Sequence, residues 1–274
     1  MLDSAHLQKL VSTAHLVRTD ILKMLNEAQS GHTGGSLSAV EIITALYFHK
    51  MKHDPQNPLW PDRDRFVLSK GHGAPALYAV LARCGYFDAS ALKTLRKMGS
   101  ILQGHPDMEV TPGVDISTGS LGQGLSMANG MALALRLDKK SSRVYVVLGD
   151  GEIQEGQVWE AAMAASHYRL DNLCAIVDCN GLQIDGQVKE IMNIEPVADK
   201  WASFGWEVFR VNGHDLGELT SAFAEAEKVK QKPSILIAKT VKGKGVSFFE
   251  GKVKYHGVAP SNDELAEALS ELKA

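Results

Sequence analysis

Residues 144–165 read VYVVLGDGEIQEGQVWEAAMAA and join three local patterns. The apolar, β-branched run at 144–148 is typical of a buried strand, and the residues from Glu155 onward are typical of a helix. Asp150 stands between two glycines at the junction. A strand that leads directly into a helix is the building block of a parallel α/β sheet. The stretch therefore predicts such a sheet and places a carboxylate where one strand ends.

The same alternation continues to residue 239. Apolar runs predict further strands, and amphipathic segments between them predict helices that cross over the sheet in the right-handed sense. The fold class we expect is α/β, a mainly parallel sheet flanked by helices on both faces. The strands are expected at 143–148, 172–178, 206–211 and 234–239, and the helices at 155–168, 196–203 and 215–230.

The amino-terminal half shows a different organisation, in which amphipathic segments alternate with loops that contain glycine and histidine. A closing loop is expected after residue 239. The chain shows no internal repeat and no linker-like stretch, so we expect one domain over 1–274. In this half the pattern predicts helices at 4–28, 36–51, 74–84, 88–98 and 121–138.

Composition excludes several function classes. The 274 residues are 45% hydrophobic and carry a net charge of −3, which gives no general attraction to nucleic acid or to an anionic membrane. No apolar run approaches the roughly 20 residues that span a bilayer, and the first residues lack the core of a signal peptide. The three cysteines, Cys84, Cys174 and Cys179, lack the spacing of a disulfide framework or zinc site. We expect a cytoplasmic protein that binds neither nucleic acid nor membrane.

Polar residues follow two successive strands of the expected sheet. Asp150 ends the first, and the segment DCNGLQIDG (178–186) with Asn180 ends the second. If these strands are neighbours, a carboxylate and an amide oxygen face one crevice, where they suit Mg²⁺ or Ca²⁺. The helix that begins near Glu155 adds free N–H groups that favour a diphosphate. Judged from the Gly-Asp-Gly triplet alone, an aspartate at this position is more often a helix N-cap than a metal ligand.

The pairing of GDG with DCNGLQIDG resembles the thiamin diphosphate fingerprint, with Cys179 standing where that pattern commonly has asparagine or aspartate. Other motifs follow in the order found in transketolases, and TVKGKG and YHG come near the end. The chain resembles most the amino-terminal section of a split transketolase. These motifs are SGHTGGSLSAVEI (30–42), SKGHGAPALYA (69–79), QGHPD (103–107) and STGSLGQGLSMANG (117–130).

The resemblance implies a thiamin diphosphate-binding fold with a bound metal ion. Asp150, Asn180 and the backbone carbonyl of Leu182 would hold Mg²⁺, for which Ca²⁺ or Mn²⁺ could substitute. Single histidines are more often structural than catalytic. Four glycine-flanked ones match histidines that surround the reacting centre in this family. The resemblance assigns His32 and His256 to proton movement, His105 to the donor sugar, and His72 to the diphosphate side.

Further cofactor contacts come from the same resemblance. Leu121 and Ile184 would pack around the thiazolium ring, and Glu155 would lie at a subunit contact near the cofactor. The ordinary alternatives are a solvated surface position for the lysines and tight helix packing for the glycines of GSLGQG, which we favour for Gly122 and Gly124. The remaining expected contacts are Lys70, Gly119, Ser120, Gly149, Gly151 and Lys242.

The resemblance also implies an activity and a partner. Transketolases transfer a two-carbon ketol unit from a ketose phosphate to an aldose phosphate in the pentose phosphate pathway. The pyrimidine-binding domain and its activating glutamate lie outside the resembling segment, so a separate carboxyl-terminal subunit would supply them. Two copies of each chain would form a heterotetramer, and this chain alone would be inactive. The alternatives are another thiamin-dependent ketol transferase, a 1-deoxyxylulose 5-phosphate synthase subunit, or a catalytically silent cofactor-binding module.

Overall fold

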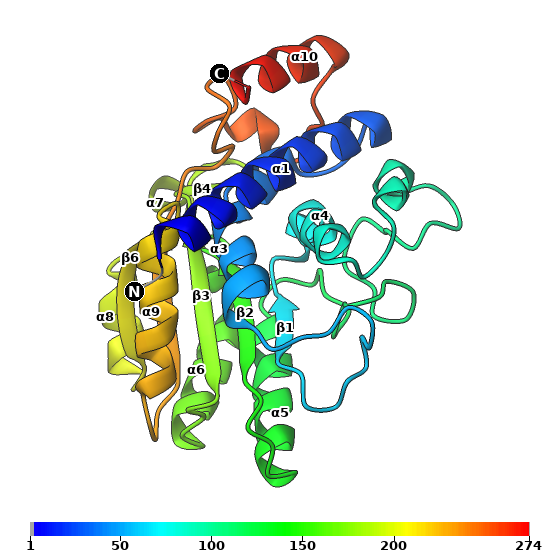
Figure 1. The fold of residues 1–274 in the computed structure, drawn as a ribbon. Helices are drawn as coiled ribbons and strands as arrows, with labels where there is room; N and C mark the ends of the chain where they lie inside the picture. Colours follow the sequence, from blue (N-terminus) through cyan, green and yellow to red (C-terminus); the bar gives the residue numbers. More distant parts are fainter. Residues whose placement is uncertain (1–2, 274) are drawn as a thin grey trace.

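A computed structural model describes residues 3–273 and has a five-stranded parallel sheet at its centre (Figure 1). The strand order is β1-β2-β3-β7-β6, and every neighbouring pair is parallel. The prediction of a mainly parallel α/β fold is confirmed. The strands are β1 (Arg65–Leu68), β2 (Val144–Gly149), β3 (Leu173–Cys179), β6 (Glu207–Asn212) and β7 (Ser234–Lys239).

Helices bury both faces of this sheet, which explains why the central strands are apolar without alternation. In β2, Tyr145 and Val147 pack into one hydrophobic cluster, whereas Val144, Val146 and Leu148 pack into the other. The first cluster lies under α1 (Ser4–Ala28), α3 (Val40–Ala45), α4 (Ala74–Cys84) and α9 (Leu216–Lys228), and the second under α5 (Gly124–Leu137), α6 (Gly156–His167) and α8 (Val197–Ser203).

The predictions of two helices in the amino-terminal half were wrong in extent or type. The segment expected as one helix at 36–51 is α2 (Thr33–Leu37), α3 and a π-helical turn at Leu46–Lys50, because Ala39 leaves the helical region at φ −94° and ψ 0°. The helix expected at 88–98 is a 3₁₀ segment at Ala89–Thr94. Arg96 adopts a left-handed conformation with φ 60°, which stops any continuation.

Several elements were not expected from the sequence, among them β1, α10 and the short elements within residues 182–191. Strand β1 has four residues after a charged stretch, so it is too short to show a period. Helix α10 (Asn262–Glu271) lies in the expected closing loop and begins with a capping box between Ser261 and Glu264. Among residues 3–273, none of the helices combines the length and the apolar composition needed to cross a membrane.

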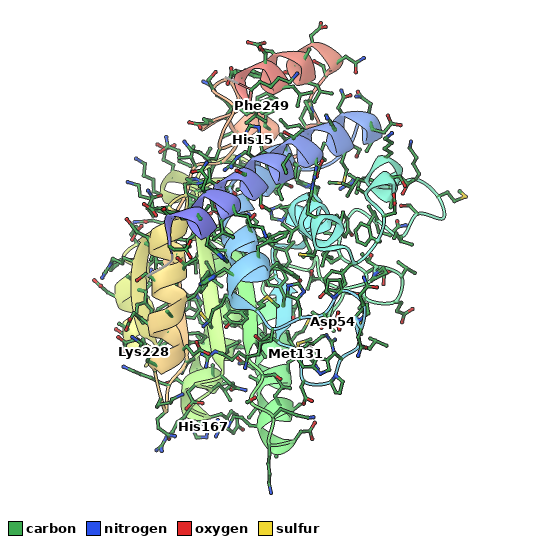
Figure 2. All side chains as sticks on the ribbon, viewed as in Figure 1. His15, Asp54, Met131, His167, Lys228 and Phe249 are labelled. Atoms are coloured by element: carbon green, nitrogen blue, oxygen red, sulfur yellow. The ribbon has the colours of Figure 1, made fainter. Side chains whose placement is uncertain are left out.

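The carboxyl ends of the five parallel strands form one edge of the sheet. Leu68 of β1 pairs with Val147, and Gly149 of β2 pairs with Asp178 of β3, so the strands that carry Asp150 and Asn180 are neighbours as expected. Figure 2 labels His167, at the carboxyl end of α6, at the lower end of the molecule, away from this edge. A small hairpin of β4 (Leu182–Gln183) and β5 (Gly186–Gln187), followed by α7 (Val188–Ile191), extends beyond β3.

Candidate functional site

Asp150 is buried in the loop between β2 and α6. Its Oδ1 accepts a hydrogen bond from the Gly151 N–H at 2.9 Å, and its Oδ2 accepts one from the Gly181 N–H at 2.5 Å. A Cβ at Gly151 would lie 3.1 Å from the Cβ of Gln183, so the glycine permits the close approach of two loops. Burial and the nearby Asp178 raise the pKa of Asp150 to about 6, although both backbone hydrogen bonds oppose the rise. Within the described part of the chain this carboxylate has no cation in direct contact, which suits an ion ligand.

Asn180 and Leu182 supply neutral oxygens in the loop after β3. The Asn180 Oδ1 accepts a hydrogen bond from the Leu182 N–H at 3.1 Å. The Leu182 carbonyl accepts one from the Lys242 ammonium, also at 3.1 Å. Residues 3–273 contain no group of three or more His, Cys, Asp or Glu side chains that could hold a metal ion. A carboxylate, an amide and a carbonyl are instead hard oxygen donors, and this donor set fits Mg²⁺.

A buried ion pair lies behind these residues. The Lys70 ammonium is 2.5 Å from Asp178 Oδ2 and donates to the Gly35 carbonyl at 2.8 Å. Ser38 donates to the same carboxylate at 2.6 Å, and Thr240 also donates to it. Burial alone would raise the pKa of Asp178, but the Lys70 charge and the three hydrogen bonds hold it below its ordinary value. The Lys70 ammonium is thus fixed within the protein, and its predicted contact with the cofactor stays a prediction.

Removing one partner of this pair should destabilise the fold. We expect Lys70→Met to lower the free energy of unfolding by about 3–5 kcal/mol, because Asp178 would remain buried without its cation. Adding Asp178→Asn should restore part of the loss. Denaturant unfolding followed by circular dichroism measures both changes. The control is Lys228→Met, which breaks an exposed ion pair with Glu225 and should have little effect on the free energy of unfolding. Equal effects of the two substitutions would contradict a stabilising role for the buried Lys70–Asp178 pair.

Three of the four predicted histidines form a cluster. The ring centroids of His32 and His72 are 5.2 Å apart, those of His72 and His256 are 5.3 Å apart, and those of His32 and His256 are 5.5 Å apart. They come from the start of α2, the loop after β1 and the segment Val253–His256. Lys242 links this cluster to Leu182, because its Nζ is also 2.6 Å from His256 Nδ1.

The environment keeps these imidazoles neutral near pH 7. Burial, assisted by the Arg96 charge, lowers the pKa of His32 to about 4, and burial and Lys242 lower that of His256 to about 3. Burial and the Lys70 charge hold the pKa of His72 well below its usual range. The Nδ1 of His32 is buried without a hydrogen-bond partner among the described residues. Each neutral imidazole has one nitrogen that donates and one that accepts a hydrogen bond, so these rings can contact the hydroxyl groups of a bound molecule.

His105 lies on a separate loop against Gly119. A Cβ at Gly119, whose φ is 142°, would lie 2.8 Å from the His105 ring, and a Cβ at Gly71 would lie 2.8 Å from the Gly119 nitrogen. Only glycine fits this contact of three loops. Ser120 is exposed and Leu121 is half-buried beside it. The structure therefore brings the segment 119–121 close to the histidine-bearing loops.

Two predicted contacts stand apart from this cluster. Glu155 is exposed at the N-cap of α6 and makes no side-chain capping bond. Ile184 is 64% exposed at the turn of the β4–β5 hairpin. A cavity of about 500 Å³ lies beside Asp150, but its lining of apolar residues such as Val188 and charged residues such as Arg210 includes none of the clustered histidines.

Several residues of this region were missed by sequence reasoning. Asp178 offered a signal, because it is a charged residue at the end of an apolar strand. The partners Ser38 and Thr240 offered none, because they approach Asp178 from 140 and 62 residues away. Glu152, directly after the GDG motif, is 3% exposed and was also missed. Long-range hydrogen bonds of this kind leave no periodic pattern in the sequence.

Comparison with known proteins identifies what the chain is similar to. The family model described as "Transketolase, thiamine diphosphate binding domain" matches residues 7–273. A 6-deoxy-6-sulfo-D-fructose transketolase subunit of a Clostridium species is 49% identical, over 95% of this chain and 94% of the relative. An apulose-4-phosphate transketolase subunit of Phocaeicola vulgatus is 44% identical, over 93% of this chain and 90% of the relative.

Longer relatives match through part of their length. Human transketolase is 44% identical over 97% of this chain, which corresponds to 42% of the human protein. The crystal structure of Campylobacter jejuni transketolase superimposes with a TM-score of 0.90 and 34% identity, over 99% of this chain and 43% of that one. The chain thus spans most of the subunit-type relatives and less than half of the single-chain ones.

Proposed function

The chain belongs to the transketolase family, and on that basis we propose that it is the amino-terminal, cofactor-holding subunit of a two-component transketolase. The observation that carries the proposal is the convergence of buried Asp150, Asn180 and the Leu182 carbonyl with three neutral histidines at one sheet edge. Relatives of similar length are named as transketolase subunits, which supports a separate partner chain.

We propose that Asp150, Asn180 and the Leu182 carbonyl hold Mg²⁺ against the diphosphate of thiamin diphosphate. Thiamin diphosphate, when bound, supplies the nucleophilic carbon needed to break and form the carbon–carbon bond of a ketose. Lys242 is 2% exposed and has no carboxylate within ion-pair distance among the described residues, so an anionic diphosphate would compensate its charge. Lys70, Gly149, Gly151, Glu155, Ile184 and the segment 119–121 complete the set of cofactor contacts that we propose.

The histidines would move protons at the sugar. Lys242 donates to His256 Nδ1, which leaves the proton of the neutral imidazole on Nε2, where it can be donated to a sugar oxygen. His32 offers a neutral ring whose unprotonated nitrogen can accept a hydrogen bond from a hydroxyl group of the sugar. We place His105 at the donor sugar and His72 beside the diphosphate.

We propose that the partner is a carboxyl-terminal subunit that supplies the pyrimidine-binding domain and its activating glutamate, with two copies of each chain in a cytoplasmic heterotetramer. The substrates we propose are ketose and aldose phosphates. The names of the subunit-type relatives, which refer to a sulfosugar and to apulose 4-phosphate, support sugars with an anionic end.

Metal binding should depend on pH through Asp150. Its pKa is about 6, so we expect the Mg²⁺ affinity of the protein to fall as pH decreases through 6, approaching tenfold per pH unit as protons compete for the carboxylate. The pKa values of His32 and His256, about 4 and about 3, keep both rings neutral in this window. Titration calorimetry with thiamin diphosphate at pH 5 to 8 measures the effect. An affinity that stays constant down to pH 5 would argue against Asp150 as a ligand.

The reaction class is tested on the complex purified with its natural partner. We expect ketol transfer between pentose phosphates and no condensation of pyruvate with glyceraldehyde 3-phosphate. The reverse result would favour a 1-deoxyxylulose 5-phosphate synthase. Neither activity in a complex that binds thiamin diphosphate would favour another thiamin-dependent ketol transferase or a silent cofactor-binding module.

A further inference from the structure

Glu152 lies in a short 3₁₀ turn (Glu152–Gln154) directly after the GDG motif, and its side chain is buried. We propose that Glu152 is a positioning residue that fixes three cofactor-binding segments relative to one another. The inference rests on the proposed function and extends it to a residue that touches neither the metal ligands' oxygens nor the histidine cluster.

The Glu152 carboxylate receives one hydrogen bond from each of two loops and one from the end of strand β2. Its Oε1 accepts from the Ser69 hydroxyl and from the Gly122 N–H at 3.0 Å, and its Oε2 accepts from the Gly149 N–H at 3.1 Å. Each donor is next in sequence to a proposed cofactor contact. These neighbours are Lys70, Leu121 and Asp150. One side chain thus connects the loop after β1, the loop before α5 and the last residue of β2.

These segments approach one another so closely that glycine is needed at two of their contacts. A Cβ at Gly124 would overlap the Ser69 side chain, and a Cβ at Gly122 would lie 2.8 Å from the Cβ of Glu155. Backbone N–H groups at such contacts need an acceptor, because a buried donor without a partner is costly. A carboxylate is acceptor-only when ionised, so one Glu can satisfy all three donors.

Glu152 has no cationic partner within 4.0 Å among residues 3–273, unlike the paired Asp178. Burying an unpaired carboxylate is an inefficient way to stabilise a fold, since its desolvation offsets much of the hydrogen-bond energy. We therefore infer that Glu152 contributes mainly by fixing the arrangement of these segments and less by stabilising the fold. Segments displaced by about 1 Å would misplace the Gly149–Asp150 backbone and Leu121 relative to a bound cofactor.

The test compares Glu152→Gln with Asp64→Asn, both made in the complex with the natural partner. Asp64 is also a buried carboxylate, and it accepts from the Lys52 N–H at 2.8 Å and the Arg143 N–H at 2.7 Å. It precedes β1 at the opposite, amino-terminal edge of the sheet. Titration calorimetry measures the dissociation constant of thiamin diphosphate with saturating Mg²⁺, thermal unfolding measures stability, and ketol transfer gives the turnover at saturating cofactor.

We expect Glu152→Gln to raise the dissociation constant of thiamin diphosphate about tenfold or more. The amide N–H₂ group of Gln cannot accept a hydrogen bond, so at least one donor loses its partner. Turnover at saturating cofactor should stay within about threefold of wild type, since the proton-moving groups are unchanged. Asp64→Asn should lower the unfolding temperature and leave the dissociation constant unchanged. An unchanged constant in Glu152→Gln, or an equal rise in Asp64→Asn, would overturn the inference.

Two further results keep the inference separate from the proposed function. If Glu152→Gln does not fold, Ser69→Ala removes a single donor and should raise the dissociation constant about threefold; no rise would overturn the inference. If the wild-type complex itself does not bind thiamin diphosphate, the proposed function fails, and the inference fails with it. If the wild type binds thiamin diphosphate and Glu152→Gln has the same dissociation constant, only the role of Glu152 is refuted and the proposed function stands.

Discussion

Replacing Asp150 with alanine is expected to abolish the Mg²⁺-dependent binding of thiamin diphosphate. Asp150 is the only carboxylate of the proposed ligand set, and altering groups that merely support a metal ligand already costs about 10–100-fold in affinity. Loss of the ligand itself should exceed about 100-fold. Titration calorimetry of the complex, with and without Mg²⁺, measures the change. Unchanged Mg²⁺-dependent affinity would remove Asp150 from the metal site.

The fold should survive this substitution. Burial raises the pKa of Asp150 above its value in the unfolded chain, so the carboxylate favours folding only when protonated. That contribution is complete below its ordinary pKa and is lost as pH rises through about 6. At pH 7 Asp150→Ala therefore removes two hydrogen bonds together with an unfavourable buried charge. Asp185→Ala, at an exposed position in the neighbouring hairpin, is the matched control and should leave cofactor binding intact.

Alanine at His32, His105 or His256 is expected to lower turnover by about 10²–10⁴-fold while changing cofactor affinity far less. The physical reason is that these rings would act on protons of the sugar, whereas the metal and Lys242 would hold the diphosphate. His72 should behave differently and weaken binding more strongly. Steady-state kinetics of the complex at saturating cofactor, together with calorimetry, separates the two effects.

The control for this series is His167→Ala, because His167 is exposed at the far end of α6 (Figure 2). It should leave both turnover and affinity at wild-type values. A histidine variant that loses affinity but keeps full turnover at saturating cofactor would be reassigned from proton transfer to binding.

Local sequence patterns were sufficient to predict the elements that carry the site. Helix α1 spans Ser4–Ala28 and α4 spans Ala74–Cys84, as their periodicity and flanking signals indicated. The strands before Asp150 and Asn180 are adjacent, as parallel βαβ connections favour. Burial raises the pKa of the Cys179 thiol well above its usual range, so this departure from the fingerprint places a neutral small side chain beside Asn180.

What could not be predicted depends on contacts between distant segments. The pairing of Lys70 with Asp178 joins residues 108 apart, and no spacing rule connects them. The three donors to Glu152 come from segments whose approach is set by the packing of β1, α5 and β2. The preference for Gly122 and Gly124 as packing glycines agrees with their close contacts to Glu155 and Ser69. These features follow from the assembled fold and leave little trace in the local sequence.

The central claim is that this chain holds the cofactor but completes its active site only with a partner subunit. The most direct test is the rate of ketol transfer between pentose phosphates, measured for the rigorously purified chain, for the purified partner, and for their mixture with Mg²⁺ and thiamin diphosphate. We predict no activity in either chain alone, and activity in the mixture that reaches its maximum at equimolar chains. Full ketol transfer by this chain alone would contradict the account.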